Sequence, residues 1–167
     1  MATVKQQFDC RDLIPYASAG PTFGVSDSSG GSAYPIDRLS FAAATAGQSA
    51  AVRFKASNYG SGNLTLVIRW YAAATTGDVQ WNAQIVAISP GDAQSVLTDA
   101  LATATNTVTT VNGTTNGLNT TSVTISNLDS LAADDEVWLV ITRNNGGSDT
   151  MSGAALLLGF ELQYSDT

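Results

Sequence analysis

The sequence of 167 residues contains no histidine and only one cysteine, Cys10. The lack of histidine excludes Ser-His-Asp triads, histidine general-base catalysis and histidine-ligated metals. A single cysteine can form neither an intramolecular disulfide nor a cysteine-rich zinc site, and it fits synthesis in a reducing cytoplasm. The chain also has only two lysines, and it has no glycine-rich nucleotide-binding motif. We therefore expect a protein that is not an enzyme and that carries no cofactor and no metal.

Charge is also scarce, since charged residues make up 13% of the chain, against a usual share of about 25%. Seven basic and 14 acidic side chains give a net charge of −7, which argues against a nucleic-acid partner. The longest apolar run, residues 154–160, is far shorter than the roughly 20 residues of a membrane helix. No secretory signal is visible at the N-terminus. We expect a soluble protein with no membrane partner.

Serine and threonine are abundant, and from residue 36 onward apolar and polar residues alternate as they do in β-strands. The clearest strand covers residues 63–72, where Leu64, Leu66 and Ile68 share one face. A short helix is expected at 92–102 because Val96 and Leu97 begin a helical spacing after a proline. Residues 103–117 are expected to form a hairpin. Further strands are expected at 38–41, 52–55, 79–88, 122–126, 136–143 and 154–164.

About eight short strands separated by Gly, Asn and Asp turns predict an all-β protein. The missing crossover helices exclude a parallel α/β sheet. The expected fold is an antiparallel two-sheet β-sandwich, of jelly-roll type. We expect two parts: an extended N-terminal arm with loops at residues 1–35, and the β-sandwich domain at residues 36–167.

The N-terminal part lacks sustained periodicity but holds apolar anchors, among them Phe8, Leu13, Tyr16 and Phe23. Two interpretations are open. The anchors either close one end of the chain's own core or lie on a neighbouring subunit. For the second interpretation the candidate contact residues of the arm are Phe8, Arg11, Leu13, Tyr16 and Phe23.

Four aromatic residues could form a platform on which a sugar ring stacks. Trp70 and Trp81 lie on the apolar phase of their strands, which favours core packing. Tyr71 and Trp138 lie on the opposite phase, and they are the candidate surface aromatics.

The densest acidic cluster is Asp134, Asp135 and Glu136. A carboxylate-rich turn can hold Ca²⁺, but adjacent residues of a strand point apart. A solvated turn that opens a strand is the favoured interpretation. No spacing selects a carboxylate pair for glycoside hydrolysis. Cys10 has no base that would activate it, and we interpret it as a buried or interface thiol.

The stretches RWYAAATTGDVQWNAQIVAISPGD, from residue 69, and LVITRNNGGSDTMSGAALLLGFELQY, from residue 139, carry a resemblance. Residues 36–164 resemble small jelly-roll structural proteins of tailed bacteriophages. The shared features are a Trp-bearing strand, a Thr-Gly-Asp-Val-x-Trp turn, and an Arg-ended strand followed by an Asp-Thr loop.

This resemblance implies a virion component. The first hypothesis is a capsid decoration (cement) protein that binds the major capsid protein on the outer shell, as a homotrimer, after assembly in the host cytoplasm. The alternative is a tail or head fibre or appendage module that binds host-surface glycans. A free carbohydrate-binding or enzymatic domain is the third hypothesis.

Overall fold

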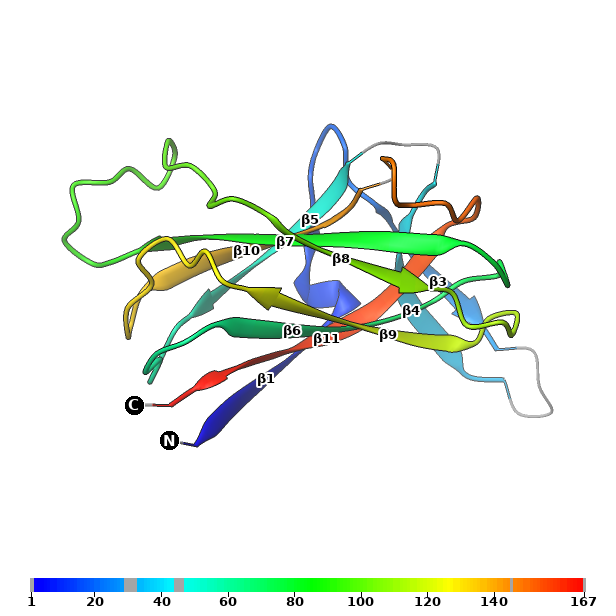
Figure 1. The fold of residues 1–167 in the computed structure, drawn as a ribbon, viewed down its shortest axis with the longest axis horizontal. Coiled ribbons are helices and arrows are strands. Elements are labelled where there is room, and N and C mark those ends of the chain that lie inside the picture. Colours follow the sequence, from blue (N-terminus) through cyan, green and yellow to red (C-terminus); the bar gives the residue numbers. More distant parts are fainter. Residues whose placement is uncertain (1, 29–32, 44–46, 145, 167) are drawn as a thin grey trace.

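The computed structural model describes residues 2–28, 33–43, 47–144 and 146–166, which form two packed antiparallel sheets (Figure 1). The first sheet has six strands: β1 (Thr3–Asp9), β3 (Thr22–Asp27), β4 (Pro35–Phe41), β6 (Leu64–Tyr71), β9 (Leu118–Ile125) and β11 (Ala155–Ser165). The second has five: β2 (Ile14–Pro15), β5 (Gln48–Lys55), β7 (Asp78–Ile88), β8 (Thr105–Thr110) and β10 (Glu136–Arg143). The predicted all-β sandwich is confirmed.

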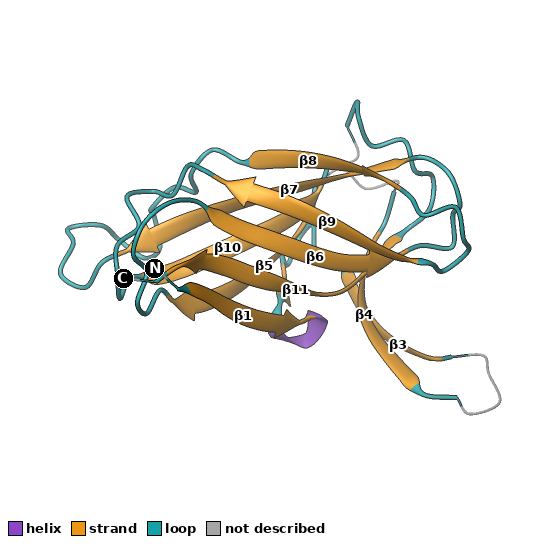
Figure 2. Cartoon of the chain, turned by 60° about the horizontal axis from the view of Figure 1, so that its bottom comes forward, coloured by secondary structure: helices purple, strands orange, loops and turns teal. Residues whose placement is uncertain are grey.

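The six-stranded sheet runs β3-β4-β11-β6-β9, and the five-stranded sheet runs β2-β5-β10-β7-β8. β1 and β4 share the same strand partner, because β11 pairs through its first residues with β4 and through its later residues with β1. The first half of β4 pairs only with β3, so these two strands form a hairpin that projects from the body of the sandwich (Figure 2).

The N-terminal segment supplies strands to both sheets. β1 pairs with β11 from Thr3 to Asp9, and its inward face packs Val4 and Phe8 on the core. A single 3-10 turn, η1 (Cys10–Asp12), leads to β2, which pairs with β5. The third strand of this segment, β3, pairs with β4 in the projecting hairpin. Of the two open interpretations, the first applies to Phe8 and Leu13, which pack in the chain's own core.

The core lies between the two sheets. Buried and partly exposed residues alternate strictly along β6, so every second residue of this strand faces the core. Trp70 and Trp81 are fully buried, as predicted, and their rings meet edge to face with centroids 6.1 Å apart. Phe41 meets Trp81 in the same manner at 5.1 Å. The indole Nε1 of Trp70 donates to Thr121 Oγ1 at 3.0 Å, which satisfies a polar group that burial would otherwise penalise.

A buried ion pair ties one end of the two sheets together. Arg143, at the end of β10, holds Asp149 through two bonds, from Nε at 2.8 Å and from Nη2 at 2.7 Å. The same guanidinium donates to the backbone carbonyls of Phe41, Met151 and Gly153. The loop between β10 and β11 is thereby fixed against β4.

Two expectations for residues 92–117 are wrong. Residues 92–102 form turns instead of a helix, in a loop that leaves the sandwich at the left of Figure 1. Val96 and Leu97 are 62% and 93% exposed, and a short helix with no apolar face to bury is not stable. Residues 103–117 do not form a hairpin, because β8 pairs with β7 and β9 pairs with β6. The turn between them crosses from one sheet to the other.

The two chain ends lie side by side at the pole opposite the projecting hairpin (Figures 1 and 2). Asp166 N donates to the carbonyl oxygen of Ala2 at 2.9 Å. Among the described residues, no helix is long and apolar enough to cross a membrane.

Candidate functional site

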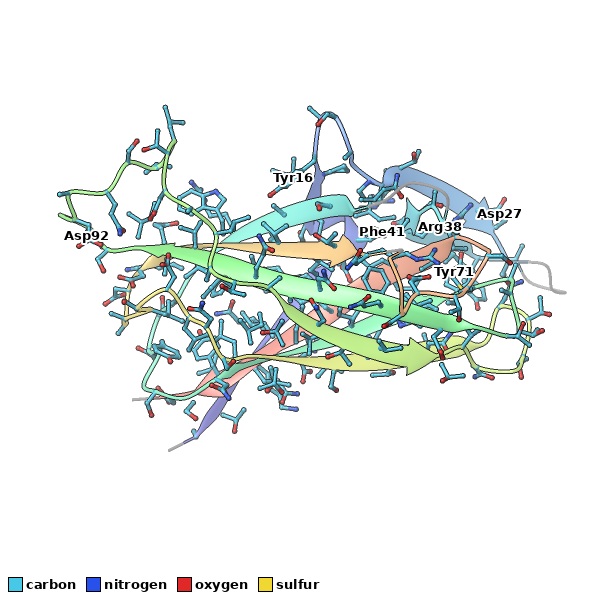
Figure 3. The ribbon with its side chains drawn as sticks, turned by 45° about the horizontal axis from the view of Figure 1, so that its top comes forward. Tyr16, Asp27, Arg38, Phe41, Tyr71 and Asp92 are labelled. Atoms are coloured by element: carbon cyan, nitrogen blue, oxygen red, sulfur yellow. The ribbon has the colours of Figure 1, made fainter. Side chains whose placement is uncertain are left out.

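A cleft of about 570 Å³ lies on the outer face of the six-stranded sheet, where the β3–β4 hairpin rises from it. Figure 3 places Asp27, Arg38 and Tyr71 together at this end of the molecule, far from Asp92 at the opposite end. The cleft is lined by Ser26, Asp27, Ser28, Tyr34, Ile36, Arg38, Tyr71, Asn116, Leu118, Leu156 and Leu158. We call this set the hairpin cleft.

Strand alternation builds the floor of the hairpin cleft. On β6, Trp70 points into the core, so its neighbour Tyr71 points outward. The ladder places Leu156 of β11 and Leu118 of β9 on either side of Tyr71. Leu118 is 57% exposed. The floor is therefore an apolar strip with one aromatic ring at its centre.

The projecting hairpin supplies the polar wall. Arg38 lies on the outward face of β4, since Leu39 beside it is buried, and its Nη1 donates to Ser26 Oγ. The hairpin tip is closed by Ser28, which donates its backbone N–H to the Tyr34 carbonyl at 2.9 Å and accepts from Tyr34 N at 3.0 Å. Tyr34 is 62% exposed at the rim. An apolar floor beside a few hydrogen-bonding groups is the usual composition of a small-molecule site.

The two predicted surface aromatics are not brought together. Tyr71 lies in the hairpin cleft, whereas Trp138 lies on β10 of the other sheet, opposite Arg53 and Val86. Trp138 is half-buried. Sequence reasoning missed Tyr34 and Arg38. Tyr34 follows a Gly/Ser run that carries no strand periodicity, and the position of Arg38 beside Tyr71 depends on a long-range pairing.

The five candidate contact residues of the N-terminal segment divide into two groups. Phe8 stacks on Phe160 with ring centroids 4.9 Å apart, and Leu13 is buried. Tyr16 and Phe23 are 41% and 45% exposed. The Arg11 guanidinium lies 5.8 Å from the centre of the Phe23 ring.

A second hollow, of about 420 Å³, is lined by Cys10, Arg11, Leu13, Pro15, Phe23 and Leu39, so it brings together three of the five candidate residues. Arg11 forms an ion pair with Asp37 at 2.6 Å. A hydrogen bond to Asp37 raises the pKa of Arg11 above its ordinary value. Cys10 is buried, and this burial raises the pKa of its thiol, so the thiolate needed for nucleophilic attack is disfavoured.

The acidic residues of the turn before β10 are used structurally. Asp135 is buried, and it accepts from Ala132 N at 2.7 Å and from the Ser89 hydroxyl at 2.5 Å. Asp134 pairs with Lys55 at 2.8 Å. Within the described part of the chain, no three acidic or thiol side chains are arranged to hold a metal ion. The turn differs from the expected solvated one in the burial of its middle residue.

No protein-family model matches the sequence, and no curated protein matches it. Among solved structures, the chain is similar to a family 11 carbohydrate-binding module of a cellulosomal cellulase of Clostridium thermocellum. That alignment covers 97% of this chain and 95% of the module, with 11% identity and a TM-score of 0.51. A family 11 module from C. thermocellum in complex with a β-1,3-1,4-mixed-linked tetrasaccharide aligns over 95% and 94%, with 12% identity and a TM-score of 0.50.

A family 35 carbohydrate-binding module from the same organism covers 95% of this chain and 97% of its own, with 13% identity and a TM-score of 0.49. At these identities the similarity establishes the fold alone. The chain is a small jelly-roll β-sandwich, the architecture that it shares with the two family 11 modules.

Proposed function

We propose that the protein is a non-catalytic binding module that takes a saccharide in the hairpin cleft. The observation that carries this proposal is the meeting of Tyr71 and the leucine floor with the hydrogen-bonding wall of Ser26, Asp27 and Arg38 in one cleft. The fold similarity to carbohydrate-binding modules, one of them solved with a tetrasaccharide, supports the same function.

The chemistry of the cleft suits a sugar ring. A pyranose has C–H groups on its faces and hydroxyls around its edge. The phenol ring of Tyr71 and the side chains of Leu156 and Leu158 offer the apolar surface for the ring face. Asp27 and Arg38 offer an acceptor-only and a donor-only group for the edge hydroxyls.

A binding experiment with paired variants tests this proposal. Tyr71→Ala removes the central ring, and we expect it to weaken saccharide binding by about tenfold or more, as truncation of a central aromatic contact does. Tyr16→Ala removes a partly exposed aromatic residue that does not line the cleft and serves as the matched control. A glycan array followed by calorimetry measures both. Unchanged binding by the Tyr71 variant, or equal losses in both variants, would contradict the cleft as the site.

The location of this module in a virion is a further part of the proposal. The resemblance of residues 36–164 to structural proteins of tailed bacteriophages favours a fibre or appendage module that binds host-surface glycans. Such a module would act at the surface of the particle. Its hairpin cleft would bind host-surface glycans during adsorption, before the genome is delivered. Loss of adsorption by particles that carry Tyr71→Ala, with normal particle assembly, is the expected result.

A capsid decoration protein is the second candidate function. The observation that favours it is the exposed apolar surface of Ile14, Tyr16 and Phe23, since such surfaces mark protein contacts. The partners would be the major capsid protein and two further copies of this chain. Tyr16→Ala combined with Phe23→Ala should then abolish binding to empty shells and leave saccharide binding intact. Hundreds of copies per purified particle would favour this candidate, and a handful would contradict it.

A further inference from the structure

We propose that the ligand of the hairpin cleft is an acidic saccharide, whose carboxylate pairs with Arg38. This inference rests on the proposed saccharide-binding function and specifies its substrate class. It predicts that a hexuronic acid, which carries a carboxylate on the sugar ring itself, is preferred over the corresponding neutral hexose.

Most of the basic side chains in this protein already have a carboxylate partner. The chain has seven, against 14 acidic ones. Five of the seven form ion pairs: Lys5 with Glu161, Arg11 with Asp37, Arg53 with Glu136, Lys55 with Asp134, and Arg143 with Asp149. Within the described ranges, Arg38 and Arg69 alone have no carboxylate within 4.0 Å. In so acidic a chain, an arginine without a carboxylate partner is the exception.

The two exceptions differ in their surroundings. Both lie on the outer face of the six-stranded sheet, by the alternation of β4 and β6. Arg69 donates to Gln7 Oε1 at 2.8 Å, and its charge helps to lower the pKa of the nearby Glu161. Arg38 alone lines the hairpin cleft, where a ligand would meet it.

The guanidinium of Arg38 is positioned by the neighbouring strand. Gly24 stands opposite Arg38 in the β3–β4 ladder, and a Cβ at Gly24 would lie 3.8 Å from the Cζ atom. The guanidinium therefore lies across the backbone of β3. Ser26 Oγ accepts one of its N–H groups, and no other acceptor in the described part of the chain contacts it. A guanidinium has five N–H donors, so donors remain for a ligand.

A carboxylate fits these donors better than a sugar hydroxyl does. It can accept two parallel N–H bonds from one guanidinium, and such charge-assisted pairs are about twice as strong as neutral ones. The half-buried position of Arg38 reduces screening of this pair by solvent. Tyr71 and Leu158 line the same cleft, so the ring of a uronic acid would stack while its carboxylate reaches Arg38.

Asp27 lines the same cleft and gives the proposal a second prediction. No ion pair joins Asp27 to Arg38 in the described structure, so its charge is not neutralised there. An anionic ligand would be repelled by Asp27 as it is attracted by Arg38. Asp27→Asn should therefore strengthen binding of the acidic saccharide by a few-fold relative to binding of the neutral one.

The experiment uses the full chain and calorimetry with oligogalacturonate, and with the same oligosaccharide after reduction of its carboxyl groups. The wild-type protein should bind the acidic form at least about tenfold more tightly, which is the range of hydrogen bonds to charged groups. Arg38→Gln should remove this preference by weakening binding of the acidic form much more than binding of the neutral form. Arg53→Gln, an exposed arginine of the five-stranded sheet, is the matched control and should change neither affinity.

Each outcome decides between the two proposals. If Arg38→Gln weakens both forms equally, or if the wild-type protein prefers the reduced form, the acidic-saccharide inference is overturned while saccharide binding stands. If neither form nor any neutral saccharide of a glycan array binds to the wild-type protein, the proposed function itself fails. The unfolding temperature of each variant is measured alongside, so that a loss of fold is not counted as a loss of contact.

Discussion

At the scale of single residues, Arg143 has the largest structural role of the basic side chains. Its guanidinium links β10 of one sheet to β4 of the other and to the loop that follows β10. Both Arg143 and the Asp149 side chain are almost fully buried. A buried ion pair is stable only when its remaining donors and acceptors are also satisfied. The three backbone carbonyls that Arg143 contacts provide this satisfaction.

Breaking this pair should be costly. Asp149→Ala leaves a buried guanidinium without its counter-charge, and we expect a loss of about 3–5 kcal/mol in the free energy of unfolding. Lys55→Ala removes an exposed partner of Asp134 and should cost less than about 1 kcal/mol. Urea denaturation followed by tryptophan fluorescence measures both variants. Similar losses in the two variants would contradict the structural role of the buried pair.

The sequence indicates the burial of single residues better than their partners. Alternation in β6 was enough to predict that Trp70 points into the core and that Tyr71 points outward. Nothing in the sequence pairs Arg143 with Asp149, because the two are separated by a loop without periodicity. Likewise Arg38 and Tyr71, both in the hairpin cleft, are 33 positions apart, and only the position of β11 between β4 and β6 brings them to one face.

At the scale of elements, two glycines with the same backbone conformation have different surroundings. Gly77, in the turn before β7, and Gly91, after the same strand, both have φ near +96°. A Cβ at Gly77 would lie 2.8 Å from the Cα atom of Met151, whereas a Cβ at Gly91 would meet nothing within 4 Å. The turn at Gly77 is thus packed against the loop that Arg143 holds, and the turn at Gly91 is open.

Substitutions at these two glycines distinguish the cost of backbone strain from the cost of steric overlap. Gly91→Ala should destabilise the protein by about 1–2 kcal/mol, the cost of the left-handed region for a residue with a Cβ. Gly77→Ala has the same strain and also forces the backbone near Met151 to move, so its cost should exceed that of Gly91→Ala by at least about 1 kcal/mol. Thermal unfolding of both variants measures the difference. Equal unfolding temperatures would show that the Met151 loop yields freely.

Most of the elements that the sequence did not predict depend on segments that are distant in the chain. β1 pairs with β11 and β2 pairs with β5, whereas β3 pairs with β4, the next strand along the chain. The pattern of Gln6, Gln7 and Asp9 around Phe8 does not resemble a strand, but the edge of β11 offers hydrogen bonds to any extended segment. The long strands β6, β7, β10 and β11 were predicted because apolar residues recur at every second position along much of each strand.

At the scale of the whole molecule, the N-terminal segment is part of the sandwich. Removing residues 1–9 would expose one edge of β11 and the contact of Phe8 with Phe160 and Phe54. We expect this truncation to remove a large part of a total stability that is only about 5–15 kcal/mol for a domain. It should also promote aggregation through the open strand edge. Circular dichroism and size-exclusion chromatography measure these effects.

A truncated chain that stays monomeric and unfolds at the wild-type temperature would contradict this integrated role. It would support a detachable N-terminal arm instead. Phe8→Ala in the full chain is the milder companion variant. It keeps the strand pairing and removes only the packed ring, so its loss of stability should be smaller than that of the truncation.

Because its two chain ends lie close together, the protein is suited to insertion into a larger polypeptide. Ala2 and Asp166 are already hydrogen-bonded to each other. Insertion into a surface loop of a carrier polypeptide would therefore cost little conformational entropy, because the two junctions are already close together. Attachment at this pole would place the β3–β4 hairpin at the end of the molecule away from the carrier (Figure 2). Under the proposed saccharide-binding function, many copies displayed in this way on one carrier would bind a repetitive polymer simultaneously, and weak individual contacts would add up to a high overall avidity.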